Sequence, residues 1–178
     1  MTVIIAATNH NHTIIAADRR ISDTTTGRYW DSPHNTKIAK HDDLMIGVAG
    51  DQPILQHIMY GWQPPSERAY DHDLAMHTQI LPSLLEHIGD IDGEWEAIIT
   101  IRHTIYVVDK TGFTHDDNHP YAAIGSGAGY ALGYMTSHID QDLAINEGVL
   151  GAAIIAAADF NNNVSSTFGT LTYVQPRK

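Results

Sequence analysis

The sequence predicts an α+β fold, a four-layer αββα sandwich in which two central β-sheets carry helices on their outer faces. Strand-like and helix-like segments come in segregated blocks: strands, two helices, strands, two helices and a strand. Such blocks favour α+β layers over alternating βαβ units. Residues 2–7 and 13–18 are short apolar runs, which is the pattern of a hairpin of two buried strands at the start of the chain.

The composition describes one globular domain over residues 1–178. Hydrophobic residues make up 43% and charged residues 17% of the chain, which is typical of a folded domain with a sizeable core. There is no signal peptide pattern and no apolar run long enough to cross a bilayer. Cysteine is absent, which excludes disulfides, thiolate metal sites and a cysteine nucleophile and is compatible with a cytoplasmic location.

The charge balance excludes one class of partner. The formal net charge is −11, with only ten lysines and arginines. Nucleic acids and anionic membranes require a basic patch, so neither is expected as a partner.

The first hairpin holds a candidate nucleophile. A strand that starts at Thr2 holds the chain terminus rigidly, and removal of Met1 would make Thr2 the N-terminal residue. Its hydroxyl would then lie beside its own α-amine, a base with a pKa of about 8. The second strand would bring Asp18 back to the start of the first.

The middle of the chain predicts a loop, two strands and two helices. Residues 19–33 are polar and aperiodic and read as a loop, 37–40 as a short alternating segment and 44–50 as a buried strand. Helical spacing starts at Asp51 and ends before Pro64. A second helix is predicted over 71–88, with a kink or break at Pro82; its apolar stripe would consist of Leu74, Ile80, Leu81, Leu84, Leu85 and Ile88.

The second half repeats this order. Residues 96–101 and 104–109 predict two strands around a tight turn, and 112–115 a third. The segment 121–124 leads into Gly125–Gly129, followed by a helix to about His138 and an alanine-rich helix over 144–158. Residues 165–174 predict a strand, with a hairpin around Gly169 as an alternative.

Several ordered motifs together resemble the proteasome β-type subunits, including the HslV-like branch, of the N-terminal nucleophile (Ntn) hydrolases. The motifs are Thr2-Val3, then Ala17-Asp18-Arg19-Arg20, Asn35-Thr36-Lys37-Ile38, Ile46-Gly47-Val48-Ala49-Gly50-Asp51, Ala123-Ile124-Gly125-Ser126-Gly127 and Asn146-Glu147-Gly148-Val149. Each is weak alone. In this order and over nearly the whole chain, they indicate the Ntn-hydrolase fold.

The resemblance implies catalytic roles for five residues. Thr2 would attack a peptide carbonyl, with its amine moving the proton. Lys37 would stabilise the alkoxide, and Asp18 would pair with Lys37, because a lone buried ammonium is costly. Ser126 would hydrogen-bond around the amine. The Gly47 N–H would be the oxyanion donor, an interaction worth about 3 kcal/mol in hydrolases.

The resemblance also leaves choices open. Met45 and Ala49 would line the pocket for the residue before the cut bond and favour an apolar side chain. Lys40 is the alternative to Lys37. After the last helix, the family's supporting Asp and Ser have no clean match: Asp159 and Ser165 are too widely spaced, and Asn161 would then occupy the acidic position.

The segments around Lys37 depart from the family in length. The segment from Asp18 to Lys37 is three residues longer than expected, and that from Lys37 to Gly47 is shorter. The loop between Asp18 and Gly47 therefore differs from that of the family.

Metals and cofactors are not expected. The chain has twelve histidines, but none forms a recognised ligand motif with carboxylates. ATP would enter only through a partner unfoldase of the AAA+ class, which the resemblance implies.

The expected function is a threonine-type endopeptidase subunit of a homo-oligomeric, self-compartmentalised ring protease with stacked rings, acting on peptides or unfolded proteins. Maturation would require only removal of Met1. Two alternatives stay open: an Ntn amidohydrolase acting on small amides, and a non-catalytic proteasome-like shell subunit.

Overall fold

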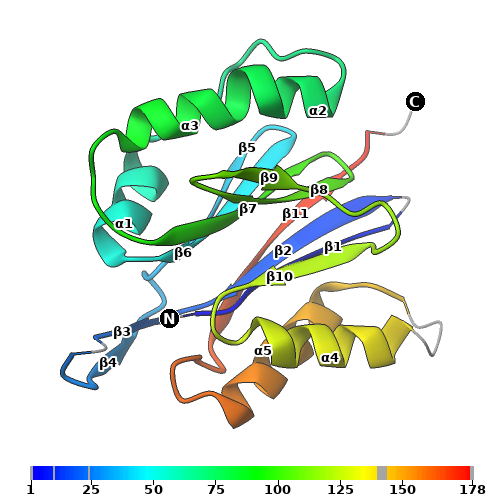
Figure 1. The fold of residues 1–178 in the computed structure, drawn as a ribbon. Helices are drawn as coiled ribbons and strands as arrows, with labels where there is room; N and C mark the ends of the chain where they lie inside the picture. Colours follow the sequence, from blue (N-terminus) through cyan, green and yellow to red (C-terminus); the bar gives the residue numbers. More distant parts are fainter. Residues whose placement is uncertain (1, 10, 24, 140–143, 177–178) are drawn as a thin grey trace.

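The computed structural model describes residues 2–9, 11–23, 25–139 and 144–176. Two antiparallel sheets are stacked face to face, with one group of helices outside each (Figure 1). The predicted α+β sandwich is confirmed, and so is the order of its blocks.

The first sheet is built on the N-terminal hairpin. Its strands are β1 (Ile4–Thr8), β2 (His12–Asp18), β10 (Tyr121–Ile124) and β11 (Phe168–Val174), in the order β10-β1-β2-β11. Ile4 pairs with Ala17. This register brings Asp18 next to the start of β1, as the sequence predicts.

The second sheet has five strands in sequential order. They are β5 (Ile38–His41), β6 (Leu44–Gly50), β7 (Trp95–Ile101), β8 (Thr104–Asp109) and β9 (Gly112–Thr114). Asp42 and Arg102 have φ of 56° and 53° in the two tight turns, where a left-handed residue closes the hairpin.

The predicted loop over residues 19–33 is wrong in part. The chain forms a two-stranded ribbon of β3 (Arg20–Ser22) and β4 (Tyr29–Asp31), which extends from the body beside the N-terminus (Figure 1). Both strands are only three residues long and have no apolar alternation, so no periodic pattern identifies them.

The helices form two separate layers. Outside the second sheet lie α1 (Gln52–Gly61), α2 (His72–Ala75), the π-helical turn η1 (Met76–Ile80) and α3 (Leu81–Ile88). Outside the first sheet lie α4 (Ala128–Ile139) and α5 (Glu147–Phe160). Asn146 caps α5, since its side chain accepts a hydrogen bond from the Val149 N–H at 3.2 Å.

The π turn accommodates Pro82, where the sequence predicts a kink or break. The Leu81 N–H bonds to the Met76 carbonyl, five residues back, so the helical path continues through a wider turn. Two members of the predicted apolar stripe, Leu74 and Leu85, are exposed at 52% and 37%, and the buried face of this segment consists instead of Ala75, Met76, Ile80, Leu81, Leu84 and Ile88.

Three apolar layers account for the continuous apolar runs. Val3, Ile5 and Ala7 face α4 and α5, whereas Ile4 and Ala6 face the second sheet. Alternate side chains of a strand point to opposite faces, so a strand buried on both faces is apolar throughout. The third layer lies between the second sheet and α1–α3.

Gly169 and Gly47 both lie inside strands. Gly169 lies within a continuous β11, opposite Ala17, and not in a hairpin turn. Gly47 lies in the interior of β6; a Cβ there would come within 2.7 Å of Ile4 Cγ2 and 2.9 Å of Ile15 Cδ1. Gly47 is therefore the residue that lets the two sheets approach each other.

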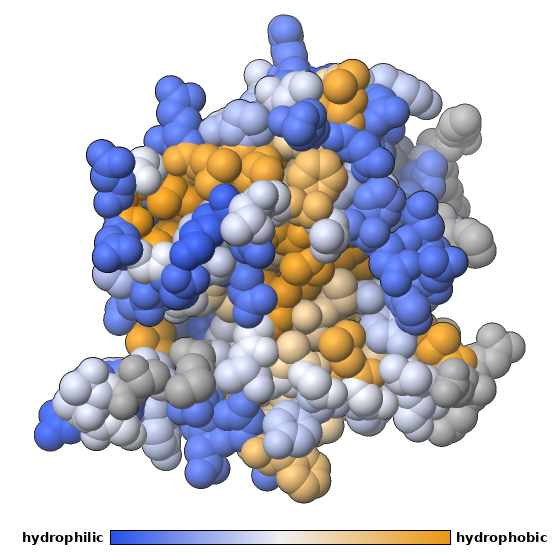
Figure 2. Space-filling model, viewed as in Figure 1, coloured by the Kyte–Doolittle hydropathy of each residue, from blue (hydrophilic) through white to orange (hydrophobic). Residues whose placement is uncertain are grey.

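Among the described residues, no helix has both the length and the apolar character needed to cross a membrane. Figure 2 shows apolar residues reaching the surface in the middle of the face drawn there, between outer parts that are mainly hydrophilic.

Candidate active site

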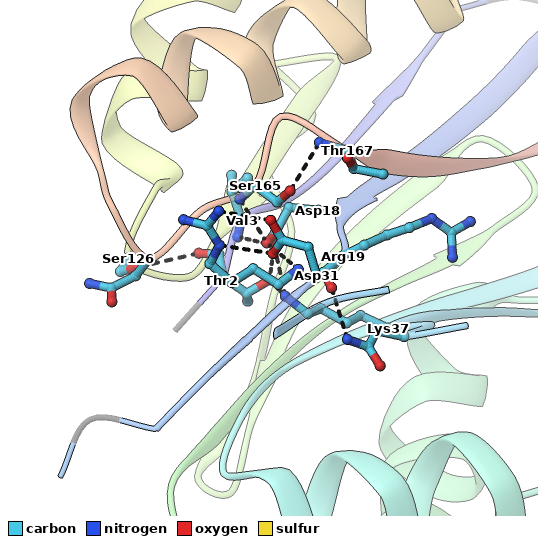
Figure 3. Close-up of polar contacts among 12 residues, drawn as sticks. Thr2, Val3, Asp18, Arg19, Asp31, Lys37, Ser126, Ser165 and Thr167 are labelled. Atoms are coloured by element: carbon cyan, nitrogen blue, oxygen red, sulfur yellow. Dashed lines mark hydrogen bonds and ion pairs between the residues drawn. The ribbon is translucent and has the colours of Figure 1, made fainter. Parts of the chain in front are cut away.

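The side chains of Thr2, Asp18 and Lys37 lie together at the edge of the first sheet where β1 begins and β2 ends (Figure 3). Thr2 Oγ donates to Asp18 Oδ1, and Lys37 Nζ donates to Thr2 Oγ and, at 2.8 Å, to Asp18 Oδ1. All three residues are buried, with exposures of 3%, 0% and 3%. The hydroxyl therefore lies between a cation and an anion that are both removed from bulk water.

Asp18 is the centre of this cluster. Besides the two side chains, its Oδ1 accepts the Val3 N–H at 3.0 Å, and its Oδ2 accepts the N–H groups of Arg20 at 3.0 Å and Ser165 at 3.2 Å. Three backbone donors from three segments thus satisfy the buried carboxylate, and charge-assisted bonds of this kind are strong.

Burial lowers the pKa of Lys37, and the charge and hydrogen bond of Asp18 oppose this effect. The alternative lysine is not part of the cluster. Lys40 is exposed, and its Nζ donates to the Thr172 carbonyl at 2.6 Å. The structure therefore brings Lys37, and not Lys40, to Thr2.

The turn between β10 and α4 encloses the carbonyl of Thr2. The Gly127 N–H donates to this oxygen at 3.1 Å and Ser126 Oγ at 3.5 Å. Gly125 has φ of 88°, and a Cβ there would lie 2.3 Å from the same oxygen. Only glycine fits this close approach.

The structure places Asp159 away from Thr2 and Asn161 against Ser126. Asp159 is exposed near the end of α5 and has no hydrogen bond to a described residue, so the structure does not bring it to Thr2. The Asn161 amide donates to Ser126 O at 2.9 Å and to Ser126 Oγ at 3.2 Å. The alternative acidic position is thus filled by an uncharged amide that contacts Ser126.

Ser165 is buried beside Asp18. Its N–H donates to Asp18, as described above, and its Oγ accepts the Thr167 N–H at 3.1 Å. Ser165 therefore supports the carboxylate and the chain that enters β11, rather than Thr2 directly.

Gly47 does not reach the pocket in front of Thr2. The Val48 N–H donates to the Lys37 carbonyl, towards β5, and alternate residues of an antiparallel strand donate to the same side. The Gly47 N–H accordingly points to its β7 partner, Ile98. The predicted oxyanion donor at Gly47 is therefore a misassignment.

Of the two β6 glycines, Gly50 and not Gly47 lines the pocket with Thr2. By the same alternation, the Gly50 N–H points to the same side of β6 as the Val48 N–H, which is the side of β5. At Gly50 the pairing of β5 with β6 has already ended. Met45 is wholly buried between the sheets and does not line the pocket, whereas Ala49 does.

The pocket in front of Thr2 has a volume of about 300 Å³. Its lining includes residues outside the family motifs, Ile21 and Ser22 from the ribbon and Glu94 and Glu96 from the start of β7, and also Arg20, which lies in a motif but was assigned no pocket role. They come from the segment predicted as a loop and from a strand end, so only the tertiary arrangement identifies them.

Asp31 lies beside the cluster (Figure 3), and Arg20 binds it. The guanidinium donates to both carboxylate oxygens, at 2.9 and 2.8 Å, and this pairing lowers the pKa of Asp31. Arg20 also lies over the Tyr29 ring, 3.9 Å from its centre. This double contact fixes β3 against β4 at the pocket wall.

No group of three or more histidine, aspartate or glutamate side chains in the described ranges is arranged to hold a metal ion.

Comparison with known proteins identifies the fold. No family model and no curated protein matches the sequence. Among solved structures, HslV from Trypanosoma brucei is similar with a TM-score of 0.74 and 17% identity over 97% of this chain and 99% of that one. BPH from Thiobacillus denitrificans has a TM-score of 0.75 and 18% identity, covering 100% of both chains, and it is also solved in complex with epoxomicin. Anbu from Yersinia bercovieri has a TM-score of 0.66 and 13% identity, covering 97% of this chain and 81% of that one.

The chain thus has the fold of the proteasome β-type subunits and of HslV, the Ntn-hydrolase fold. At these identities the likeness concerns the fold, and the chemistry rests on the site itself.

Proposed function

We propose that the chain is a threonine-type endopeptidase subunit in which Thr2, freed by removal of Met1, is the nucleophile. Met1 lies outside the described residues. The observation that carries the proposal is the buried contact of Thr2 Oγ with both Asp18 and Lys37 at the base of an open pocket. A structural threonine at a strand start does not require a buried ion pair around its hydroxyl.

The reaction follows from these positions. The Thr2 amine takes the hydroxyl proton while Oγ attacks the carbonyl carbon, and Lys37 lowers the cost of the negative oxygen. The C–N bond then breaks, and the leaving amine takes the proton. Water attacks the resulting ester, its proton passes through the amine to Oγ, and the carboxylate product leaves.

The N–H of Gly50 is our proposed oxyanion donor in place of Gly47. It lies on the strand edge that β5 leaves uncovered, next to the pocket that Thr2 lines. A donor that is already oriented before reaction needs no reorganisation when the charge develops. Ala49 would line the substrate pocket nearby.

The proposal extends to assembly, and it is supported by the fold likeness alone. We propose a homo-oligomer of stacked rings with peptides or unfolded proteins as substrates, a cytoplasmic location, and an AAA+ unfoldase as the ATP-using partner. The chain itself would need no cofactor.

Intact mass measurement tests the nucleophile. The intact mass of the purified protein is measured before and after incubation with an epoxyketone peptide. This reagent forms its adduct only with the hydroxyl and the free amine of an N-terminal threonine. We expect loss of one methionine mass and gain of one adduct. Thr2→Ala should abolish the adduct, and Thr114→Ala, which removes an exposed threonine hydroxyl, should retain it.

A non-catalytic shell subunit of the same fold is the second candidate, and the likeness to Anbu fits it. The uncharged Asn161 at the acidic position favours this candidate. Retention of Met1, or a free Thr2 that stays unlabelled, would support it and contradict the peptidase proposal. Labelling of Thr2 together with cleavage of small amides but not of peptides would support an amidohydrolase.

A further inference from the structure

The pocket in front of Thr2 has an acidic side. Asp51, Glu94 and Glu96 line it, and the cationic residues that line it are Arg20 and Lys37. Formal charge alone does not decide what such a pocket attracts, because paired charges cancel. The pairing of each group has to be considered.

Both cations of the pocket are already paired. Arg20 forms a two-point contact with Asp31 at 2.8 and 2.9 Å, and Lys37 pairs with the buried Asp18 at 2.8 Å. Glu94 is paired as well, with Lys110 at 2.7 Å. No lysine, arginine or histidine nitrogen of the described residues lies within 4 Å of the carboxylates of Asp51 and Glu96. These two carboxylates therefore leave an uncompensated negative charge.

Glu96 is held in a fixed position near Thr2. Its Oε1 accepts the Gly125 N–H at 2.8 Å, and Gly125 belongs to the turn that packs against the Thr2 carbonyl. Its Oε2 receives no hydrogen bond from a described residue. Glu96 is partly buried and lines the pocket, so its carboxylate is held by the turn rather than carried on a mobile surface side chain.

Asp51 is also oriented by the backbone. Its Oδ2 accepts the Glu94 N–H at 3.0 Å, and it lies directly after Gly50, the proposed oxyanion donor. Two oriented carboxylates thus lie within one pocket with the hydroxyl of Thr2. A substrate cation would regain in their contact the solvation that it loses on entry.

We propose that this pocket selects peptides with a basic side chain, lysine or arginine, beside the bond to be cut, with Glu96 as the main specificity-determining residue and Asp51 as the second. This inference rests on the proposed peptidase function. It replaces the apolar preference expected from Met45 and Ala49, since Met45 does not line the pocket. The net charge of −11 adds a long-range attraction for basic substrates.

Matched peptides test the selectivity. Internally quenched peptides carry lysine or norleucine, which differ by the ammonium group, at the position before or after the cut bond. We expect kcat/KM to be about tenfold or more higher for lysine in one of the two positions, the factor typical of one hydrogen bond to a charged group. Added salt should lower this ratio.

Glu96→Gln tests the assigned residue. It keeps the shape and the acceptor for the Gly125 N–H but removes the charge, so the lysine-to-norleucine ratio should fall by about tenfold. Glu86→Gln is the matched control, because Glu86 is exposed on α3 and should leave the ratio unchanged. An equal or lower kcat/KM for lysine, or a ratio that Glu96→Gln does not change, would overturn the inference.

The failure of the peptidase proposal is distinguishable from the failure of this one. Epoxyketone labelling reports the nucleophile independently of the substrate side chain. The charge selectivity is read in Thr2→Ala by calorimetric binding of the same lysine and norleucine peptides, with no turnover required. About tenfold tighter binding of the lysine peptide supports the selectivity even in an inactive protein, and equal affinities reject it.

Discussion

At the residue scale, Asp18 links the fold to the site. Its carboxylate accepts bonds from Thr2, Lys37 and three backbone N–H groups. The three backbone donors are Val3, directly before β1, Arg20, at the start of β3, and Ser165, in the segment before β11. A change at Asp18 therefore alters both the chemistry and the packing of three chain segments.

Replacement of Asp18 by asparagine should lower the free energy of unfolding by about 3 to 5 kcal/mol, because it leaves the buried Lys37 ammonium without a counter-charge. Urea unfolding followed by circular dichroism measures the change. Epoxyketone labelling should slow at the same time, since the cation near Thr2 loses its position.

The double variant Asp18→Asn/Lys37→Met is the control for this explanation. Removing both charges removes the unpaired ammonium, so the double variant should be more stable than Asp18→Asn alone. A double variant that loses as much as the sum of the two single changes would show that the ion pair is not the reason.

Gly125→Ala tests the close contact with Thr2. A Cβ would lie 2.3 Å from the Thr2 carbonyl oxygen, at a φ of 88°, so the turn or Thr2 has to move. A shift of about 1 Å costs about a hundredfold in rate, and we expect the labelling rate to fall by this factor.

Gly129→Ala provides the comparison for Gly125→Ala. It adds the same methyl group in α4, where nothing lies within 4 Å of it, and should label at the normal rate. Normal labelling of Gly125→Ala would contradict the positional role of this turn.

The sequence predicted Thr2, Asp18, Lys37 and Ser126 as site residues, because each lies in a short motif at a strand end or turn. It could not distinguish Gly47 from Gly50: both are glycines in one strand, and only the hydrogen-bonding side of each N–H, known from Val48, separates them. Glu96 had no motif at all, since its position in the pocket depends on how the two sheets stack.

At the element scale, α1 contributes one wall of the pocket and is attached to α3 by a reciprocal histidine pair. The ring Nε2 atoms of His57 and His87 each lie within hydrogen-bond distance of the other residue's backbone carbonyl, at 2.8 and 3.1 Å. The rings stack with their centres 4.3 Å apart. For both bonds to form, each ring has to carry its proton on Nε2.

A double-mutant cycle measures this attachment. His57→Ala and His87→Ala should each destabilise the fold, and the coupling energy between them should be about 0.5 to 1.5 kcal/mol, the net value of a hydrogen bond. Urea unfolding of the four proteins supplies it. Strictly additive effects would mean that the two rings act independently.

Elements with a clear period were predicted well, and short or irregular ones were not. The buried strands and α1 follow from apolar runs and helical spacing. The ribbon β3–β4 has three-residue polar strands held by the Arg20–Asp31 pair, which leaves no periodic trace. Pro82 signalled an irregular helix, but its form as a π turn depends on packing against the second sheet.

At the scale of the whole molecule, acidity should affect stability through partly buried histidines before it affects the carboxylates. Burial lowers the pKa of His72, reinforced by Arg102 and Arg68 and opposed by Asp43 and Asp71. Its ring Nδ1 lies 3.2 Å from Thr104 Oγ. Burial also lowers the pKa of His41, whose ring packs edge-on against Trp62.

The sign of the effect follows from proton binding. Below the ordinary histidine pKa of about 6.5, His72 and His41 bind a proton in the unfolded chain but stay neutral in the folded state. The free energy of unfolding should therefore fall as the pH drops from about 6.5 towards the lowered pKa values. Carboxylates, with ordinary pKa values of about 4, are still charged over most of this window.

Urea unfolding at intervals between pH 7.5 and pH 5, compared between the wild type and His72→Gln, tests this account. The variant should lose less stability on acidification, because it has removed one group that binds a proton only after unfolding. His34→Gln is the matched control, since that side chain is exposed and forms no hydrogen bond with the described residues. A wild type whose stability rises on acidification over this range would mean that relief of the repulsion among its excess negative charges outweighs the two buried rings.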